Sequence, residues 1–249
     1  MNHETGASAD AQYRRRLVGV GVGPGDPELL TLKAARIIAT ADVVFAPVRR
    51  AGERSMALEI VHSHLDEKRQ RIIVVPFPRG RLGETWTTAA RVIDENLSPG
   101  QQGVFLTEGD PLLFGSFADV MRALWEVGAD VVLETVPGVS SVTAAAAAAG
   151  IPLTDHQQRL AVIPATAGLD AIERALRDHE CVVLLKVGRG LADILRLLDR
   201  LRRLSDAVYV RRCGWPDQQI VHDVRTLLDC PPSDYFAVLI VRQNAAQEE

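Results

Sequence analysis

The stretch LVGVGVGPGDPELLTLK, residues Leu17–Lys33, decides the fold. An apolar run that alternates with glycine stops at Gly23–Pro27, and apolar residues then return at helical spacing through Leu29, Leu32 and Ile37. This pattern predicts a buried strand, a glycine-rich loop and a helix. Because glycine has no Cβ, such a loop lets a ligand approach the backbone closely.

Spacing excludes two common glycine motifs in this loop. The dinucleotide fingerprint G-x-G-x-x-G needs a third glycine three residues after the second. Counted from Gly21 that position is Pro24, and counted from Gly23 it is Asp26. A phosphate-binding P-loop ends in Gly-Lys-Ser/Thr, whereas this loop ends in Gly-Asp-Pro-Glu, whose carboxylates would repel phosphate. The loop therefore argues against a phosphate site and leaves a neutral or cationic ligand open.

Composition narrows the class of protein. The chain has 249 residues, 47% of them hydrophobic and 24% charged, which fits one large or two modest domains. Its net charge of −4 gives no reason to expect nucleic-acid binding. The N-terminus resembles no secretory signal, and proline and hydroxyl residues interrupt the longest small-apolar stretch, Val136–Leu153. We therefore expect a cytoplasmic protein without a membrane span.

The periodicity predicts alternating strands and helices, hence an α/β fold. Continuous β-branched runs indicate strands covered on both faces, and thus a largely parallel sheet. We expect a disordered tail over residues 1–16, an N-terminal α/β domain over 17–136 and a C-terminal α/β domain over 137–249. The expected strands are Leu17–Val22, Val43–Phe45, Arg71–Val75, Val104–Leu106, Val131–Thr135, Leu160–Ile163, Val182–Lys186, Val208–Val210 and Phe236–Val241. The expected helices are Leu29–Ala39, Ser55–His64, Thr85–Asn96, Phe117–Glu126, Ser141–Ala149, Leu169–Arg177 and Leu191–Leu201.

Two further segments resemble ligand-binding elements. A second glycine-acid loop, Thr107–Pro111, follows a predicted strand, where open α/β sheets place their ligands. It also fits an ordinary turn, since Gly, Asp and Pro favour turns. A third segment, Val136–Thr143, carries paired serines before a run of alanines. Its hydroxyls can cap a helix or meet a polar ligand, and the alanines alone fit close helix packing.

The three segments together resemble the tetrapyrrole methyltransferases, which use S-adenosylmethionine. The matching motifs are GVGPGDPELLTLKAA (Gly21–Ala35), FLTEGDPLLFGSF (Phe105–Phe117) and VPGVSSVTAAAAAAGIPL (Val136–Leu153). The resemblance implies two α/β domains with a cofactor cleft between them. The second and third motifs are most similar to those of enzymes that methylate C20 of precorrin-2. It thus implies an S-adenosylmethionine-dependent C-methyltransferase of cobalamin biosynthesis that acts on precorrin-2 or its cobalt complex and yields the trimethylated precorrin-3 stage.

The resemblance also implies site residues. The expected cofactor contacts are Pro24, Gly109, Asp110, Leu113, Ser140, Ser141, Leu185, Lys186 and Ala237. An acidic loop suits this cofactor, because a sulfonium with a neutral adenosine needs no phosphate cradle. Methylation at a meso carbon releases a proton, and Glu108 is the candidate base, with a plain turn residue as the alternative.

The implied substrate carries eight carboxylates, so arginines should bind it. The candidates follow predicted strands: Arg49, Arg50, Arg54, Arg79 and Arg81, with Arg211 and Arg212 after a later strand. Solvated surface charge is the alternative for each. The histidines show no metal-ligand spacing, so no metal site is expected.

Family members commonly form homodimers, and we expect one here. Two other functions stay open from the sequence. The chain could be a sister methylase that acts on uroporphyrinogen III or on another corrin carbon, or a non-catalytic cofactor-binding module.

Overall fold

The computed structural model describes residues 14–48, 52–76, 82–229, 231–232 and 234–243. It divides the chain into two compact units, Met1–Ser140 and Ser141–Glu249, here called the first and second unit. The sequence predicts a boundary after residue 136. The expected tail is mostly outside the described residues. Its last residues are not: Arg15 pairs with Asp94 at 2.6 Å and Arg16 opens the first strand, so folded structure begins earlier than expected.

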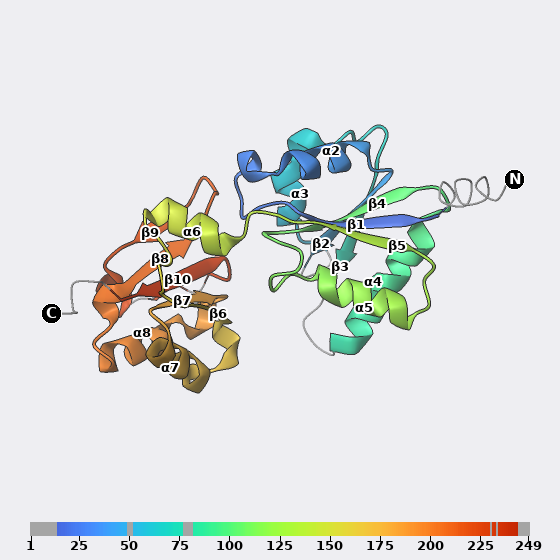
Figure 1. The fold of residues 1–249 in the computed structure, drawn as a ribbon. Coiled ribbons are helices and arrows are strands. Elements are labelled where there is room, and N and C mark those ends of the chain that lie inside the picture. Colours follow the sequence, from blue (N-terminus) through green and yellow to red (C-terminus); the bar gives the residue numbers. More distant parts are fainter. Residues whose placement is uncertain (1–13, 49–51, 77–81, 230, 233, 244–249) are drawn as a thin grey trace, which may run out of the picture. The chain divides into compact units, whose positions relative to one another are not determined.

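The first unit is built on a parallel sheet with the strand order β3-β2-β4-β1-β5 (Figure 1). Its strands are β1 (Arg16–Gly21), β2 (Val43–Val48), β3 (Arg71–Pro76), β4 (Gln102–Thr107) and β5 (Val132–Val136). Its α-helices are α2 (Leu32–Thr40), α3 (Met56–Val61), α4 (Leu82–Asn96) and α5 (Phe117–Glu126). Helices α2 and α3 cover one face of the sheet, and α4 and α5 cover the other (Figure 1). The predicted parallel sheet between helices is confirmed.

The core of the first unit explains one glycine of the opening stretch. Phe117 of α5 stacks on Phe105 of β4 with ring centroids 5.8 Å apart, and both rings are fully buried. A Cβ on Gly19 would lie 2.2 Å from the Phe117 ring. Glycine at this point of β1 therefore leaves the space in which the helix packs on the sheet.

The helix after the first loop starts later than predicted. A single 3₁₀ turn, Pro27–Leu29, comes first, and Asp26 caps it by accepting a hydrogen bond from the Glu28 amide at 2.9 Å. Thr31 then caps α2 by accepting from the Ala34 amide at 3.1 Å. Asp26 and Thr31 each accept a hydrogen bond from a backbone amide at the start of a helical segment. The expected continuous helix is therefore divided into two segments.

The second unit contains a mixed sheet with the order β6-β7-β10-β8-β9. Its strands are β6 (Leu160–Pro164), β7 (Cys181–Leu185), β8 (Ala207–Arg211), β9 (Gln219–Val221) and β10 (Ala237–Arg242). Only β6 and β7 pair in parallel, and the other pairs are antiparallel. The short strand β9 was not predicted, because three residues are too few to show an alternation of polar and apolar side chains.

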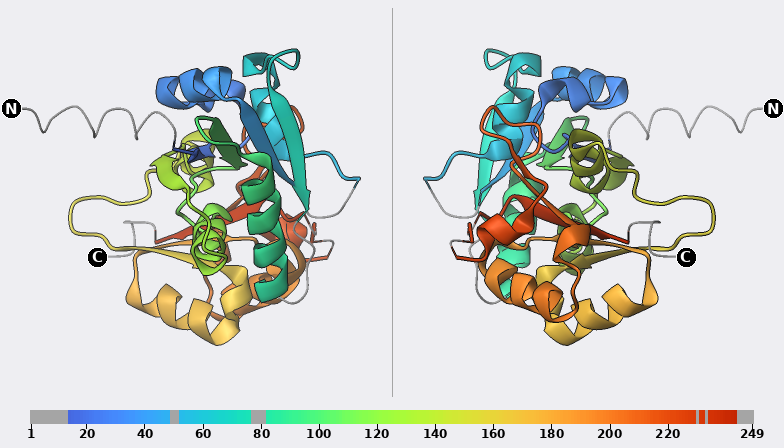
Figure 2. Two further views of the ribbon diagram at one scale, coloured as in Figure 1. Left: turned by 90° about the vertical axis from the view of Figure 1, so that its right-hand side faces the viewer. Right: turned by 90° about the vertical axis from the view of Figure 1, so that its left-hand side faces the viewer.

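Helices of the second unit pack on both faces of this sheet. They are α6 (Ser141–Ala149), α7 (Leu169–Asp178) and α8 (Leu191–Arg200). Leu191, Ile194, Leu195 and Leu198 form the buried stripe of α8, which packs with Leu184 of β7. Figure 2 shows α7 and α8 below the same face of the sheet. Among the described residues, no helix has the length and hydropathy needed to cross a membrane.

Candidate functional site

Strand order brings the three glycine-containing segments of the first unit together. β1 lies between β4 and β5, and all three strands run in parallel. Their carboxyl ends therefore lie at one edge of the sheet, where ligands of open α/β sheets bind. The segments that leave this edge start at Val22, Glu108 and Pro137. These are the three motifs that the sequence singled out.

The first two loops are joined through their glycines. Gly23 and Gly109 form an isolated antiparallel bridge, in which the Gly109 amide donates to the Gly23 carbonyl at 2.8 Å. The Gly23 amide donates to the Gly109 carbonyl at 3.4 Å. Both glycines have positive φ, 80° and 70°. Pro24, an expected cofactor contact, directly follows this bridge and is half-buried.

The third loop meets the other two backbone to backbone. A Cβ on Gly138 would lie 2.2 Å from the Gly109 carbonyl oxygen and 2.7 Å from Cα of Gly21. A Cβ on Gly21 would lie 2.5 Å from the Gly138 nitrogen. Because these neighbours are backbone atoms, no change of side-chain rotamer could relieve the clash. Gly21, Gly109 and Gly138 thus allow the backbones that follow three strands to pack in direct contact.

Asp110 fastens the second loop to the third. Its Oδ1 accepts a hydrogen bond from the Leu112 amide at 2.9 Å, and its Oδ2 accepts one from the Gly138 amide at 3.1 Å. A carboxylate offers about four acceptor sites, so each oxygen can accept a further donor. The bond to Gly138 also explains why Pro137–Ser140 belongs to the first unit.

A run of exposed apolar side chains follows Asp110. Leu112, Leu113 and Phe114 are 58%, 40% and 42% exposed. Phe114 has a φ of 55°, a backbone conformation that residues other than glycine rarely adopt. Leu113, an expected cofactor contact, therefore presents an apolar side chain beside the acidic loop.

Two polar residues, Thr107 and Glu108, lie where β4 ends and the second loop begins. The Thr107 side chain is 2% exposed, and its hydroxyl has no hydrogen-bond partner among the described residues. Glu108, the candidate base, follows directly and is half-buried. An unpaired buried hydroxyl is costly, so a hydrogen bond to a ligand there would lower the free energy.

Ser140 and Ser141 flank the start of α6. Ser141 is the first residue of this helix, and Ser140 precedes it. Both side chains are half-buried. Among the buried residues of α6 are four of its alanines, which let the helix approach β10 and β8 closely.

In the second unit, the expected cofactor contacts meet at one end of the sheet. Leu185 ends β7, Lys186 follows it, and Ala237 begins the neighbouring strand β10, in which Val238 pairs with Leu185. Leu185 and Ala237 are 7% and 2% exposed, so both residues are buried at this end of the sheet. Lys186 has φ 59° and is half-buried.

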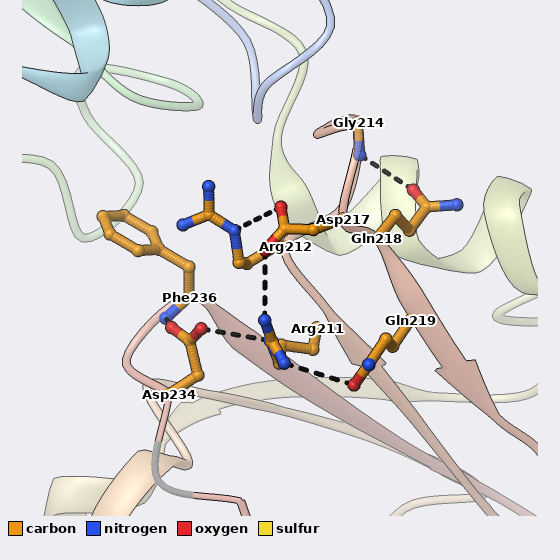
Figure 3. A network of polar contacts seen from close by, with 8 residues as sticks. All are labelled: Arg211, Arg212, Gly214, Asp217, Gln218, Gln219, Asp234 and Phe236. Atoms are coloured by element: carbon orange, nitrogen blue, oxygen red, sulfur yellow. Dashed lines mark hydrogen bonds and ion pairs between the residues drawn. The ribbon is translucent and has the colours of Figure 1, made fainter.

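The same end of the sheet carries a network of ion pairs around Arg211 and Arg212 (Figure 3). Arg211 ends β8 and contacts Asp217, Asp234 and Gln219 through its three nitrogens, at 3.1, 3.1 and 3.2 Å. Arg212 donates from Nε to Asp217 at 2.6 Å. This hydrogen bond, as the largest cause, holds the pKa of Asp217 below its usual value.

Of the substrate-binding arginines expected in the first unit, the structure describes Arg54 alone, and Arg211 and Arg212 of the second unit are both described. Arg54 is exposed in the segment before α3. Arg49, Arg50, Arg79 and Arg81 lie outside the described residues. Among the residues that the structure describes, no group of three His, Cys, Asp or Glu side chains is arranged to hold a metal ion.

Neither the role of Gly138 nor the difference between Arg211 and Arg212 can be read from the sequence. Pro-Gly after a strand reads as a turn, and only the strand order shows what Gly138 packs against. Adjacent arginines are equivalent in a sequence. The two arginines differ in backbone conformation, because Arg212 has a φ of 48°. No sequence pattern marks this difference.

Comparison with known proteins assigns this arrangement to a family. A family model described as Tetrapyrrole (Corrin/Porphyrin) Methylases matches residues 16–228. The chain is 34% identical to cobalt-precorrin-2 C(20)-methyltransferase of Salmonella typhimurium over 92% of this chain and 97% of that protein. It is 33% identical to precorrin-2 C(20)-methyltransferase of a Sinorhizobium species, over 79% of this chain and 83% of that protein.

A solved structure agrees in fold and sequence. Uroporphyrin-III C-methyl transferase from Thermus thermophilus, complexed with S-adenyl homocysteine, superposes with a TM-score of 0.67 and 27% identity. The match covers 92% of this chain and 97% of that one. Since the family model spans most of the chain and the relatives match along nearly their whole length, the chain belongs to the tetrapyrrole (corrin/porphyrin) methylases.

Proposed function

We propose that the chain is an S-adenosylmethionine-dependent methyltransferase of cobalamin biosynthesis that methylates C20 of precorrin-2 or cobalt-precorrin-2. The names of the relatives that match along most of their length support this reaction. The observation in the chain itself that carries the proposal is the convergence of three loops on Gly21, Gly109 and Gly138.

The residues at this edge fit the proposed cofactor. The edge offers acceptor oxygens at Asp110 and an exposed apolar side chain at Leu113. A neutral adenosine needs apolar surface and a few hydrogen-bond partners, and a sulfonium tolerates carboxylates nearby. When bound, S-adenosylmethionine supplies an activated methyl group. We propose Pro24, Gly109, Asp110, Leu113, Ser140, Ser141, Leu185, Lys186 and Ala237 as its contacts.

The work left to the protein is alignment and the handling of one proton. Methyl transfer to a nucleophilic carbon is chiefly a matter of holding the reactants in line. The new carbon–carbon bond forms at C20, which then loses its proton. We propose Glu108 as the acceptor of that proton, because it adjoins the loop and is half-buried. Glu108→Gln should then lower kcat with unchanged cofactor affinity, whereas a residue that only shapes the turn would lower Tm or affinity instead.

The substrate residues follow from charge. We propose that Arg49, Arg50, Arg54 and Arg79 bind carboxylates of the tetrapyrrole. Replacing Arg49 and Arg50 by glutamate should raise KM for the tetrapyrrole without changing cofactor affinity. Unchanged kinetics would identify them as surface residues.

One experiment separates the candidate functions. Binding of S-adenosylmethionine is measured by calorimetry, and methyl transfer is assayed anaerobically with precorrin-2, cobalt-precorrin-2 and uroporphyrinogen III. Turnover of either form of precorrin-2 with methylation at C20 supports the proposal. Turnover of uroporphyrinogen III alone indicates a sister methylase, and binding without turnover indicates a non-catalytic module. No binding of S-adenosylmethionine rejects all three functions.

We also propose that the protein is a cytoplasmic homodimer. The family resemblance supports the dimer. Light scattering after size-exclusion chromatography tests it, and a mass near the 27.1 kDa of one chain would reject it.

A further inference from the structure

We propose that Arg212 binds a carboxylate of the tetrapyrrole substrate, at the end of β8 in the second unit. This inference rests on the proposed function, which supplies a substrate rich in carboxylates. Arg211, its neighbour in the chain, has a structural role instead. The distinction comes from what each guanidinium already contacts.

Both terminal nitrogens of Arg211 donate hydrogen bonds, whereas its buried Nε faces a carboxylate without a hydrogen bond. Its Nε lies 3.1 Å from Asp234, its Nη2 donates to Asp217 at 3.1 Å, and its Nη1 donates to Gln219 at 3.2 Å. These partners link β8 to β9 and to the segments before β9 and β10. Both terminal nitrogens of Arg211 therefore already donate to acceptors at this end of the sheet, which leaves them less available to a ligand than those of Arg212.

Arg212 is held firmly but retains donors. Its Nε donates to Asp217 at 2.6 Å, and its guanidinium carbon lies 5.0 Å from the centroid of the Trp215 ring. Among the described residues, neither Nη1 nor Nη2 of Arg212 has a hydrogen-bond partner. Figure 3 shows these two nitrogens directed away from the carboxylate of Asp217.

The backbone of Arg212 is fixed as well. Its φ of 48° lies in the left-handed region, and its amide donates to the Phe236 carbonyl at 2.7 Å. Phe236 precedes Ala237, a proposed cofactor contact. Strained backbone that the surroundings hold in place occurs often at functional sites. The guanidinium thus reaches a ligand with little rotamer entropy left to lose.

The chemistry of the remaining donors selects the ligand. Two terminal NH₂ groups on a planar cation match the two oxygens of a carboxylate. The side chain is 23% exposed, so the pair would be partly shielded from solvent. Asp217 is shared with Arg211, so it neutralises Arg212 only in part.

The test compares three variants with the wild type in a direct binding assay and in turnover. Binding of precorrin-2 is followed anaerobically by absorbance, and S-adenosylhomocysteine binding by calorimetry. Arg212→Gln should raise Kd and KM for precorrin-2 by about 10- to 100-fold, as expected for the loss of one charge-assisted pair. Its Kd for S-adenosylhomocysteine and its Tm should stay close to wild type. Arg212→Lys keeps the charge without the fork and should recover part of the affinity.

Arg202→Gln is the matched control, because Arg202 is an exposed arginine with a similar φ of 56° that follows α8. It should leave every constant unchanged. Salt adds an independent readout: precorrin-2 binding should weaken less steeply with ionic strength in Arg212→Gln than in the wild type.

The outcomes separate this inference from the proposed function. Wild-type binding of precorrin-2 without turnover would reject the proposed function and still test Arg212 through Kd. An unchanged precorrin-2 Kd in Arg212→Gln would overturn the inference, as would a loss that tracks S-adenosylhomocysteine affinity or Tm in both Arg212 variants. No binding of precorrin-2 by the wild type would reject both.

Discussion

The carboxylate of Asp110 accepts a hydrogen bond at 3.1 Å from the amide of Gly138, a residue 28 positions further along the chain. The same carboxylate accepts from the Leu112 amide within its own loop. Asp110 therefore shapes one loop and holds another. If Asp110 contacts the cofactor as proposed, its replacement should affect binding in two ways, through the lost contact and through the position of Pro137–Ser140.

Replacing Asp110 by alanine should weaken both cofactor binding and folding. The half-buried Gly138 amide would lose its acceptor, which should lower the free energy of unfolding by about 1–3 kcal/mol. Urea unfolding and calorimetry with S-adenosylhomocysteine measure the two effects. Asp119→Asn, which alters an exposed ion pair with Arg122, should change unfolding by less than about 1 kcal/mol. Unchanged cofactor affinity in Asp110→Ala would remove Asp110 from the site.

Gly138→Ala should disrupt the meeting point of the loops. The new Cβ would lie 2.2 Å from the Gly109 carbonyl oxygen, so the backbone must move. We expect a loss of about 1–3 kcal/mol in unfolding free energy and weaker cofactor binding. Gly190→Ala is the control, because its Cβ would meet nothing closer than 3.8 Å. Equal stability of the two variants would contradict the close packing at Gly138.

Local pattern was enough to predict the parallel sheet and the loops that leave it. Apolar runs and turn residues give strands and loops directly, so the stretch at Leu17–Lys33 was assigned correctly apart from the helix start. Contacts between distant residues were not accessible in the same way. The bond from Asp110 to Gly138 depends on β1 lying between β4 and β5, and one sequence does not give strand order.

The backbone of Phe114 offers a test of strain in the second loop. For an L-residue the left-handed conformation costs about 1–2 kcal/mol, which glycine avoids. Phe114→Gly should therefore be more stable to urea than Phe114→Ala by about 1 kcal/mol. At Leu112, which has no positive φ, the order should reverse, since glycine loses more backbone entropy than alanine. A less stable glycine variant at both positions would show that Phe114 is not strained.

An ion pair in the second unit should make stability depend on pH at acidic values. The side chain of Arg159 donates to Glu180 at 3.1 Å, and its backbone amide donates at 2.7 Å. Chiefly the side-chain hydrogen bond lowers the pKa of Glu180 to about 2 from a usual 4.5. A carboxylate with a lowered folded-state pKa stabilises the fold fully above its unfolded pKa and loses this contribution as pH falls through the folded value.

The advantage of wild type over Glu180→Gln in urea unfolding should therefore be constant above about pH 5 and shrink between pH 4.5 and 2. Both residues are exposed enough that salt should reduce the advantage. Glu126→Gln, an exposed carboxylate at the end of α5, serves as the control for general acid effects. If the difference between wild type and Glu180→Gln stayed constant down to pH 2, the pairing with Arg159 would not be lowering the pKa of Glu180. A loss of stability on acidification, and not the contact alone, would show that the Arg159–Glu180 ion pair stabilises the fold.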